Sequence, residues 1–230
     1  ASAELSLQSP VAEGCWVSLP YGEYAPGQFH DHLDLAPGQD SSREVTAAAA
    51  GTVTTAAWND AWGNQVILDH GDGVQTVYSH LDSLAVAQGE TVTAGQPIGQ
   101  MGQSGQATGV HLAFGLLVDG QPVYENPAVK AKISVIPDEL YHFQSASTRD
   151  MMKFYRGLYP GFNDKRYQAL KEAFPEVDEK QPIRRLSKGM QKQSAFWLAL
   201  CCRPDYLLLD EPVDGLDPVM RRQVWSLLMN

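Results

Sequence analysis

Histidines gather in the first part of the chain, beside residues that could help them bind a metal ion. Five of the six histidines precede residue 130, and they are His30, His32, His70, His80 and His111. The segment FHDHLDL also places Asp34 four residues after His30. Imidazole nitrogens and carboxylate oxygens are common protein ligands of zinc. Because a lone histidine in a strand is more often structural, the grouping rather than any single residue indicates a metal site.

The segment HLAFGLL, residues 111–117, raises the question of a missing ligand. Side chains alternate along a strand, so His111 and residue 113 are expected on the same face. Position 113 is alanine, whose methyl group cannot coordinate a metal. A second histidine at this position would complete a metal site. The segment is therefore either a zinc site that lacks one ligand or a strand that never held a metal.

Short strands between turns are expected to position these residues. Between residues 45 and 125 the runs GTVTTAAW, NQVILDH, VQTVYSH, PIGQM and HLAFGLLV alternate with glycine-rich turn signals. This pattern predicts an all-β domain of hairpins, with His80 at a strand end and His111 just after the turn GQSGQATG. The segment GETVTAGQPIG also suits a lipoyl or biotinyl carrier. That carrier needs an acceptor lysine, and no lysine precedes Lys130.

A change in composition predicts two domains, at residues 1–130 and 131–230. The first part holds 14 acidic residues against only Arg43 and Lys130, whereas the second holds 13 acidic and 15 basic residues. Neither part is basic enough to predict nucleic acid as a partner. No apolar run approaches the roughly 18 residues that span a bilayer, so we expect no membrane span.

The first part resembles the lysostaphin-type (LytM-like) zinc metalloendopeptidases, which cut peptide cross-links in bacterial cell walls. The family pattern is H-x-x-x-D, then Y-x-H, then H-x-H after a glycine-rich turn. The matching stretches here are HDHLD at 30–34, YSH at 78–80 and HLA at 111–113. The resemblance extends over residues 1–128 and implies the β-sheet fold of this family, a cell-wall peptide as the partner and an extracytoplasmic location.

The resemblance also implies a role for each matching residue. His30 and Asp34 correspond to two zinc ligands, and the second histidine of H-x-H, here Ala113, corresponds to the third. His80 and His111 correspond to the histidines that orient the attacking water and stabilise the oxyanion. A catalytic zinc takes three protein ligands and one open position. The resemblance therefore implies weak or absent zinc and an inactive or impaired peptidase.

Two features of this site remain open at the level of sequence. His32 replaces the family's glycine between His30 and Asp34, and it is a possible substitute ligand because alternate residues of an extended segment share a face. Ala113 is either a natural loss or a deliberate inactivating substitution. A natural loss would suit a non-catalytic module that binds the cell wall or a partner protein through the degenerate groove.

The second part resembles the ATP-binding subunits of ABC transporters over residues 132–230. Helical spacing begins near residue 141 and is followed by LSKGMQKQ at 186–193, which matches the signature motif, and YLLLDEP at 206–212, which matches Walker B. These motifs imply a mainly α segment with a Walker B strand, as a fragment of an α/β ATPase. An ATP-hydrolysing transport subunit is therefore an alternative function for the chain.

In that family the motifs act on nucleotide. Ser187 and Gly189 correspond to residues that face the γ-phosphate on a partner subunit, Asp210 to the magnesium ligand and Glu211 to the residue that orients water. No G-x-x-x-x-G-K-[ST] phosphate loop occurs in the sequence. ATP and magnesium are thus expected only if a partner completes the site. Because a cell-wall peptidase and a cytoplasmic ATPase work in different compartments, we interpret the chain as a chimera.

Overall fold

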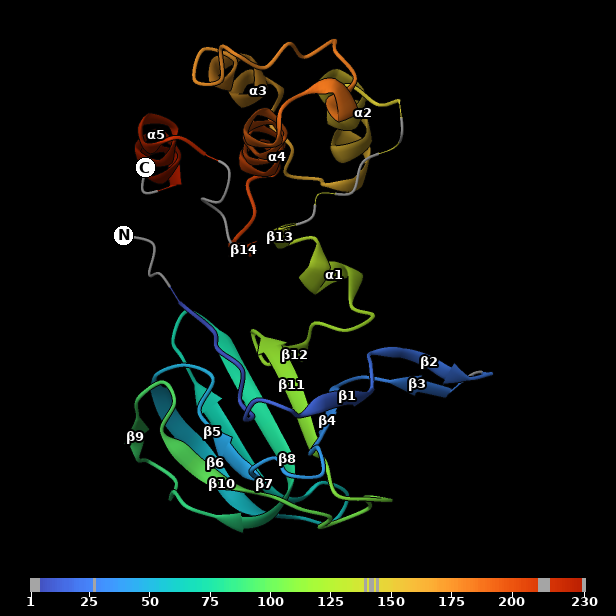
Figure 1. Cartoon of the computed structure of the whole chain (residues 1–230), viewed down its shortest axis with the longest axis vertical. Helices are drawn as coiled ribbons and strands as arrows, with labels where there is room; N and C mark the ends of the chain where they lie inside the picture. Colours follow the sequence, from blue (N-terminus) through green and yellow to red (C-terminus); the bar gives the residue numbers. More distant parts are fainter. Residues whose placement is uncertain are drawn as a thin grey trace. The chain divides into compact units, whose positions relative to one another are not determined.

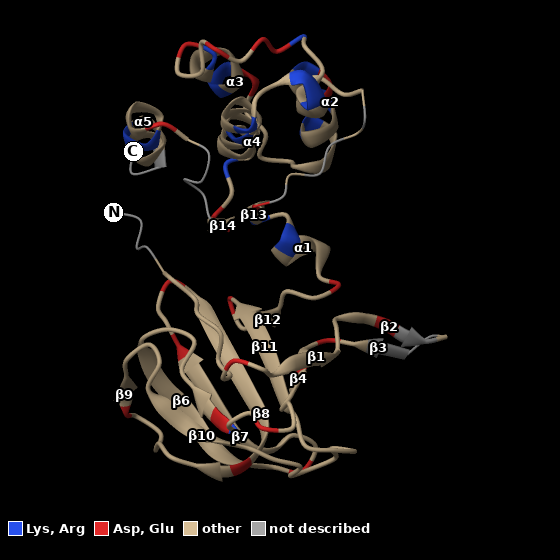
Figure 2. Ribbon diagram, in the orientation of Figure 1, with Lys and Arg blue, Asp and Glu red and all other residues tan. Residues whose placement is uncertain are grey.

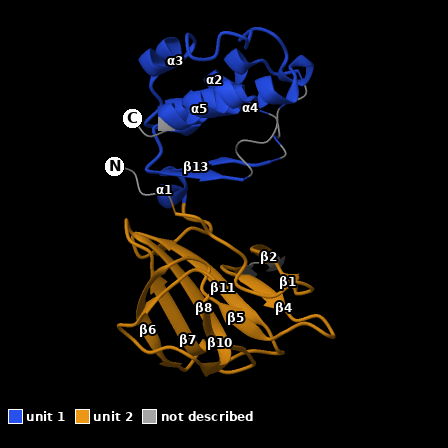
Figure 3. Cartoon of the chain, turned by 60° about the vertical axis from the view of Figure 1, so that its left-hand side comes forward, with its two compact units in different colours: residues 1–2, 127–230 blue, residues 3–126 orange. Residues whose placement is uncertain are grey.

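The computed structural model describes residues 5–26, 28–138, 140, 143, 145–210 and 216–228. The chain divides into two compact units, coloured separately in Figure 3. Unit 2 contains residues 3–126, and unit 1 contains residues 1–2 and 127–230. Within the described residues, no helix is long and apolar enough to cross a membrane. Each unit has its own hydrophobic core.

Unit 2 is built on an antiparallel sheet (Figure 1). Its main path runs β1-β4-β11-β8-β7-β6-β9, while β10 pairs with β5 and β8, and β12 pairs with β11. The hairpin of β2 and β3 forms a separate small sheet. The strands are β1 (Trp16–Leu19), β2 (Gly22–Ala25), β3 (Gln28–His30), β4 (Leu33–Ala36), β5 (Glu44–Thr46), β6 (Gly51–Asn59), β7 (Gly63–Asp69), β8 (Val74–Leu84), β9 (Thr91–Val92), β10 (Pro97–Met101), β11 (Leu112–Val118) and β12 (Gln121–Pro122).

The core of unit 2 explains why the central strands form. Val66 and Leu68 on β7 and Thr76 and Tyr78 on β8 are alternate buried residues, as expected for strands with one face on a core, and β8 is then buried continuously from Tyr78 to Leu81. Tyr78 is fully buried and its hydroxyl accepts a hydrogen bond from the Ala48 N–H at 2.8 Å. The ring of the half-buried His70 contacts the Ala50 carbonyl at 2.8 Å and the Thr76 hydroxyl at 2.7 Å, so both of its nitrogens have partners beside this core.

Unit 1 combines helices with two parallel strands. Strand β13 (Ile133–Ile136) pairs with β14 (Tyr206–Leu209), with Ile133 opposite Tyr206. The helices are α1 (Pro127–Lys130), α2 (Thr148–Leu158), α3 (Asp164–Leu170), the 3₁₀ turn η1 (Ile183–Arg185), α4 (Lys188–Cys202) and α5 (Pro218–Leu228). The predicted fold classes, all-β for the first part and mainly α with a Walker B strand for the second, are confirmed.

Helix α4 lies at the centre of the unit 1 core. Trp197 on α4 is fully buried, stacks on Tyr167 of α3 with ring centroids 4.6 Å apart, and donates a hydrogen bond from its indole nitrogen to the Tyr167 carbonyl at 2.9 Å. Phe174 packs on the same indole. Figure 2 shows the basic residues on the helices of unit 1. Arg43 is the only Lys or Arg in the sequence of unit 2, so the charge asymmetry of the sequence follows the two units.

Candidate metal and peptidase site

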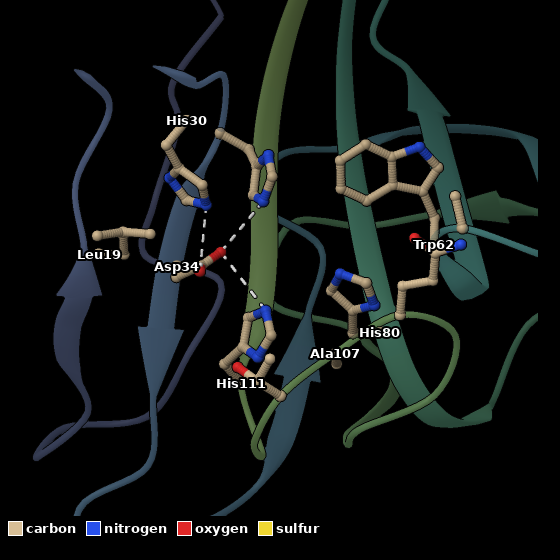
Figure 4. Close-up of a pocket in the computed structure, with 11 residues that line it drawn as sticks. Leu19, His30, Asp34, Trp62, His80, Ala107 and His111 are labelled. Carbon is tan, nitrogen blue, oxygen red and sulfur yellow. Dashed lines mark ion pairs between the residues drawn. The ribbon is translucent and has the colours of Figure 1, made fainter. Parts of the chain in front are cut away.

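A pocket of about 410 Å³ in unit 2 collects the histidines of the predicted pattern (Figure 4). They come from the end of β3, from the connection between β3 and β4, from β8 and from the segment that leads into β11, whereas Asp34 lies on β4. The residues important for the site are His30, His32, Asp34, Trp62, His80 and His111. Segments far apart in the sequence meet here because β4, β11 and β8 are neighbours in the sheet.

The carboxylate of Asp34 is the point on which three imidazoles converge. Nε2 of His30 lies 3.2 Å from Asp34 Oδ2, and Nε2 of His32 lies 3.3 Å from Oδ1. Nε2 of His111 lies 3.5 Å from the same Oδ1 atom. Figure 4 shows His30 and His111 turned toward the carboxylate. Asp34 thus has three imidazole nitrogens around its carboxylate in the pocket.

The electrostatic surroundings favour the charged form of Asp34. Burial would raise its pKa, but the hydrogen bond from His32 and the charges of His111 and His30 outweigh this effect and lower the pKa. For His32, burial would lower the pKa, yet its hydrogen bonds with Asp34 and Asp31 raise it. The carboxylate therefore remains ionised near neutral pH.

The histidine rings are oriented by contacts on their far nitrogen. In each of three rings Nδ1 lies against a backbone carbonyl, which requires Nδ1 to carry the proton and leaves the Nε2 lone pair for the pocket. The pairs are His30 with Pro20 at 3.2 Å, His80 with Ser104 at 2.8 Å and His111 with Gly109 at 2.9 Å. Such anchoring is typical of histidines that bind a metal or transfer a proton.

His80 is placed by an irregularity in β8. Its φ angle is +63°, and the pairing of β7 with β8 shifts register beside it, between Asn64 and Val66. A bulge of this kind redirects a side chain that a regular strand would point elsewhere. The His80 N–H donates to the Trp62 carbonyl at 2.8 Å, which holds the bulge in place. Burial, together with the nearby His111 and His32, lowers the pKa of His80, so its ring is neutral near pH 7.

Position 113 lies on β11, directly opposite Asp34 on β4 and Ser79 on β8. Directly paired residues of an antiparallel sheet project on the same face, so the Ala113 side chain lies on the Asp34 side of the sheet. Ala113 is 3% exposed and contributes only a methyl group. The structure starts β11 at Leu112, one residue after the predicted strand, and His111 forms an isolated bridge with Gly102.

The sequence reasoning missed two residues of the site, Trp62 in the lining of the pocket and Asp31, which contacts His32. Trp62 lies in the turn NDAWG and packs on both His32, at a ring separation of 4.9 Å, and His80, at 5.6 Å. Asp31 contacts His32 Nδ1 through Oδ1 at 2.7 Å. The sequence could have indicated Trp62, because a tryptophan is unusual in a polar turn. The role of Asp31 becomes visible only once the orientation of the His32 ring is known.

The donor atoms fit a zinc ion. His30, His32 and Asp34 each offer one ligand atom, and these atoms all lie within 4.8 Å of one another. The imidazole nitrogens nearest the buried Asp34 Oδ1 atom, at 3.3 Å for His32 and 3.5 Å for His111, lie farther away than in an ordinary N–H···O hydrogen bond, and a cation between these atoms would complete the surroundings of the carboxylate. Two imidazoles and a carboxylate form a donor set that occurs in catalytic zinc sites.

The nucleotide-related residues lie in unit 1. Ser187 is the N-cap of α4, where its hydroxyl accepts a hydrogen bond from the Met190 N–H at 3.2 Å, and Gly189 lies in the first turn. Asp210 follows β14 and its N–H donates to the Ile136 carbonyl at 3.0 Å. Ser187 and Asp210 are both exposed. Glu211 lies outside the described residues.

Comparison with known proteins supports both resemblances. Residues 28–125 match the model of peptidase family M23, and residues 87–214, more than half of the chain, match the ABC transporter model. The second match begins inside the first, well before residue 131. In the structure the shared residues 87–125 contain β9 to β12, which belong to the sheet of unit 2.

Individual relatives show the same division. The ABC transporter ATP-binding protein YtrB of Bacillus subtilis is 28% identical over 150 residues, which cover 61% of this chain and 51% of YtrB. The peptidoglycan DD-endopeptidase ShyA of Vibrio cholerae is 44% identical over 71 residues, or 31% of this chain and 16% of ShyA. The chain thus spans about half of the first relative and a small part of the second.

Solved structures add a further likeness. A zinc-containing peptidase from Vibrio cholerae is 26% identical, with a TM-score of 0.48 over 53% of this chain and 39% of that chain.

The zinc dependence of family M23 matches the donor atoms in the pocket. The chain therefore belongs to the ABC transporter family through its later residues and carries, in unit 2, a lysostaphin-type domain of peptidase family M23.

Proposed function

We propose that unit 2 is a peptidoglycan-directed zinc metalloendopeptidase domain whose activity is reduced by the alanine at position 113. The observation that carries the proposal is the convergence of the imidazoles of His30, His32 and His111 on the Asp34 carboxylate, with His80 in the same pocket. The similarity to the peptidoglycan DD-endopeptidase ShyA supports a peptide of the bacterial cell wall as the substrate. An extracytoplasmic location of unit 2 follows from that substrate.

Zinc would be held by His30 and Asp34, and when bound it supplies a Lewis acid that activates water and polarises a peptide carbonyl. His80 presents its Nε2 atom to the pocket because Nδ1 is tied to the Ser104 carbonyl. A neutral imidazole in this position can accept a proton from the attacking water. His111 is tied in the same way to the Gly109 carbonyl, so it also presents Nε2 to the pocket, and once it has taken up a proton there it can donate that proton to the reacting amide.

Ala113 is the reason to expect reduced turnover. In the resembling family a histidine at this position is the third zinc ligand, and here its place opposite Asp34 is taken by a methyl group. A ligand set changed in this way alters both the affinity for zinc and the position of the ion in the pocket. We expect slower hydrolysis than in an otherwise identical chain with histidine at 113.

The test is hydrolysis of purified peptidoglycan and of a short cross-link peptide by the full chain. We expect slow release of free amines that a chelator abolishes, and faster release by Ala113→His. His111→Ala should lower the rate by about 10²–10⁴-fold, the usual contribution of a proton-transferring residue. If Ala113→His binds zinc and still cuts neither substrate, unit 2 is instead a non-catalytic module. Sedimentation of the chain with cell wall, with and without chelator, would then measure binding.

Unit 1 is a second candidate site of function, because its ABC transporter match includes Ser187 as the cap of α4 and Asp210 after the Walker B strand. We infer that this unit hydrolyses ATP only if a partner supplies the phosphate loop that the sequence lacks. A fluorescent ATP analogue tests this inference. Micromolar binding by the chain alone would make ATP hydrolysis the better proposal.

A further inference from the structure

We propose that His32 is the third metal ligand of unit 2, and that Asp31 orients it. The metal site would then consist of His30, His32 and Asp34, three alternate residues of one short segment. This proposal deepens the proposed function, on which it rests for the identity of the ion. It assigns a ligand to a position where the resembling peptidases have glycine.

The first argument is the spacing of the donor atoms. Zinc binds imidazole nitrogen at about 2.0–2.1 Å in a tetrahedral site, so neighbouring ligand atoms lie roughly 3.3 Å apart. Nε2 of His30 is 3.2 Å from Asp34 Oδ2, and Nε2 of His32 is 3.3 Å from Asp34 Oδ1. The two contacts involve different oxygens of the carboxylate, so each imidazole nitrogen lies about one ligand–ligand distance from Asp34, and the three donor atoms together lie within 4.8 Å of one another.

His111 is the competing candidate, since its Nε2 atom lies 3.5 Å from Asp34 Oδ1. Among the described residues, however, the donor atoms that lie within 4.8 Å of one another belong to His30, His32 and Asp34, and His111 is not part of this group. His111 is therefore beside the ion rather than bound to it. It stays available for the role that the resemblance gives it.

The second argument is the contact on the other side of the His32 ring. Its Nδ1 atom lies 2.7 Å from Asp31 Oδ1, so the ring N–H donates to a carboxylate while Nε2 points at Asp34. Histidines that bind metal commonly make this outer hydrogen bond, which fixes the ring and strengthens the free nitrogen as a ligand. A glycine at position 32 would offer neither nitrogen.

Packing holds the His32 ring inside the pocket. The ring lies between His30, at a centroid distance of 3.9 Å, and the edge of Trp62, at 4.9 Å. Its side chain is only 16% exposed, although it lies in the short connection between β3 and β4. Both ring nitrogens of His32 have carboxylate neighbours, Asp31 and Asp34, so the ring can stay in the pocket with its polar atoms satisfied.

The sheet explains why this position can replace residue 113. Ala113 is paired with Asp34, so a histidine there would approach the carboxylate from the neighbouring strand. His32 reaches the same carboxylate from two residues earlier on the same segment, because the chain bends at His32 between β3 and β4 and brings its Nε2 atom to 3.3 Å from Asp34 Oδ1. The histidine at 32 and the alanine at 113 are thus complementary departures from the family pattern.

The experiment measures metal binding by the full chain, with Zn²⁺ in competition with a chromophoric chelator and with Co²⁺ by visible absorption. We expect one tightly bound Zn²⁺ per chain and a tetrahedral Co²⁺ spectrum. His32→Gly, which restores the residue of the family, should weaken Zn²⁺ binding by more than 100-fold. Asp31→Asn should weaken it by about 10–100-fold, as is usual for an outer hydrogen-bond partner.

Two further variants make the result specific. The double variant His32→Gly with Ala113→His should recover tight Zn²⁺ binding, because it rebuilds the ligand set that the resemblance implies. His111→Ala should keep the affinity of the parent chain. Matched thermal unfolding curves in chelator show that loss of metal in His32→Gly is not loss of fold.

The proposal is overturned if His32→Gly binds Zn²⁺ as tightly as the parent chain, or if the parent chain holds no Zn²⁺. It is also overturned if His111→Ala, rather than His32→Gly, abolishes binding. A different result would contradict the proposed peptidase function. In that case the chain binds Zn²⁺ tightly through His32 but hydrolyses no cell-wall peptide. Affinity and turnover therefore distinguish the two failures.

Discussion

The loop that anchors His80 contains Gly105, and the substitution Gly105→Ala tests how tightly this loop packs. Gly71→Ala is the matched control. Gly105 has φ +70°, and a Cβ atom added there would lie 2.7 Å from the Ala61 carbonyl oxygen and would overlap the Gly63 backbone nitrogen. A non-glycine residue in left-handed conformation costs about 1–2 kcal/mol. The overlap with backbone atoms adds roughly 1–3 kcal/mol, as overpacking does.

Gly71→Ala separates these two contributions. Gly71 has φ +86°, but nothing lies within 4 Å of an added Cβ atom, so this variant carries only the conformational cost. We expect Gly105→Ala to lower the free energy of unfolding of unit 2 by about 1–3 kcal/mol more than Gly71→Ala does. The movement of the loop should also reach the site, because the neighbouring Ser104 carbonyl holds His80 Nδ1 at 2.8 Å.

Hydrogen–deuterium exchange of peptides from β7 and β8 measures this stability without a contribution from unit 1. The expected difference corresponds to roughly 5- to 150-fold faster exchange of the slowest amides in Gly105→Ala than in Gly71→Ala. Peptide hydrolysis should fall in Gly105→Ala and stay near the parent value in Gly71→Ala. Equal exchange rates in the two variants would refute the argument from backbone overlap.

Further predictions concern the other contacts of the two units. In unit 1, burial would raise the pKa of Glu179, but hydrogen bonds from Lys171, Tyr167 and Arg149 lower the pKa below its ordinary value. The ionised carboxylate therefore stabilises the fold at pH values above its ordinary pKa. This stabilisation is lost as the pH falls through the lowered pKa of the folded state. Glu179→Gln should therefore lower the free energy of unfolding by about 2 kcal/mol at pH 7, and urea unfolding should show the difference disappearing in acid. Proteinase K should leave a resistant fragment that ends near residues 126–132, because each unit has its own core; protection of only the full-length chain would contradict this. Trypsin would be a poor choice because it cleaves after Lys and Arg, and Arg43 is the only such residue in the sequence of unit 2.

Local features of the sequence determined much of the architecture. Short β-rich runs separated by glycine turns predicted the strands of unit 2, because turn residues end one strand and let the chain return as the next. The helical spacing after residue 141 predicted the helices of unit 1 in the same way. Motifs with fixed spacing, HDHLD and LSKGMQKQ, identified both families, since ligand and cap positions are set over a few residues.

The tertiary structure decided which residues meet and how they are oriented. The sequence left His32 as a possible substitute ligand, and only the folded connection between β3 and β4 brings its Nε2 atom to Asp34 and its Nδ1 atom to Asp31. The position of His80 depends on a bulge in the pairing of β7 with β8, and no local sequence pattern predicted this bulge. Residues 87–125 match both families in sequence, yet they form strands of the peptidase sheet. Sequence spacing fixes contacts within one element, whereas pairing between distant strands and the orientation of each ring arise only when the whole sheet is assembled.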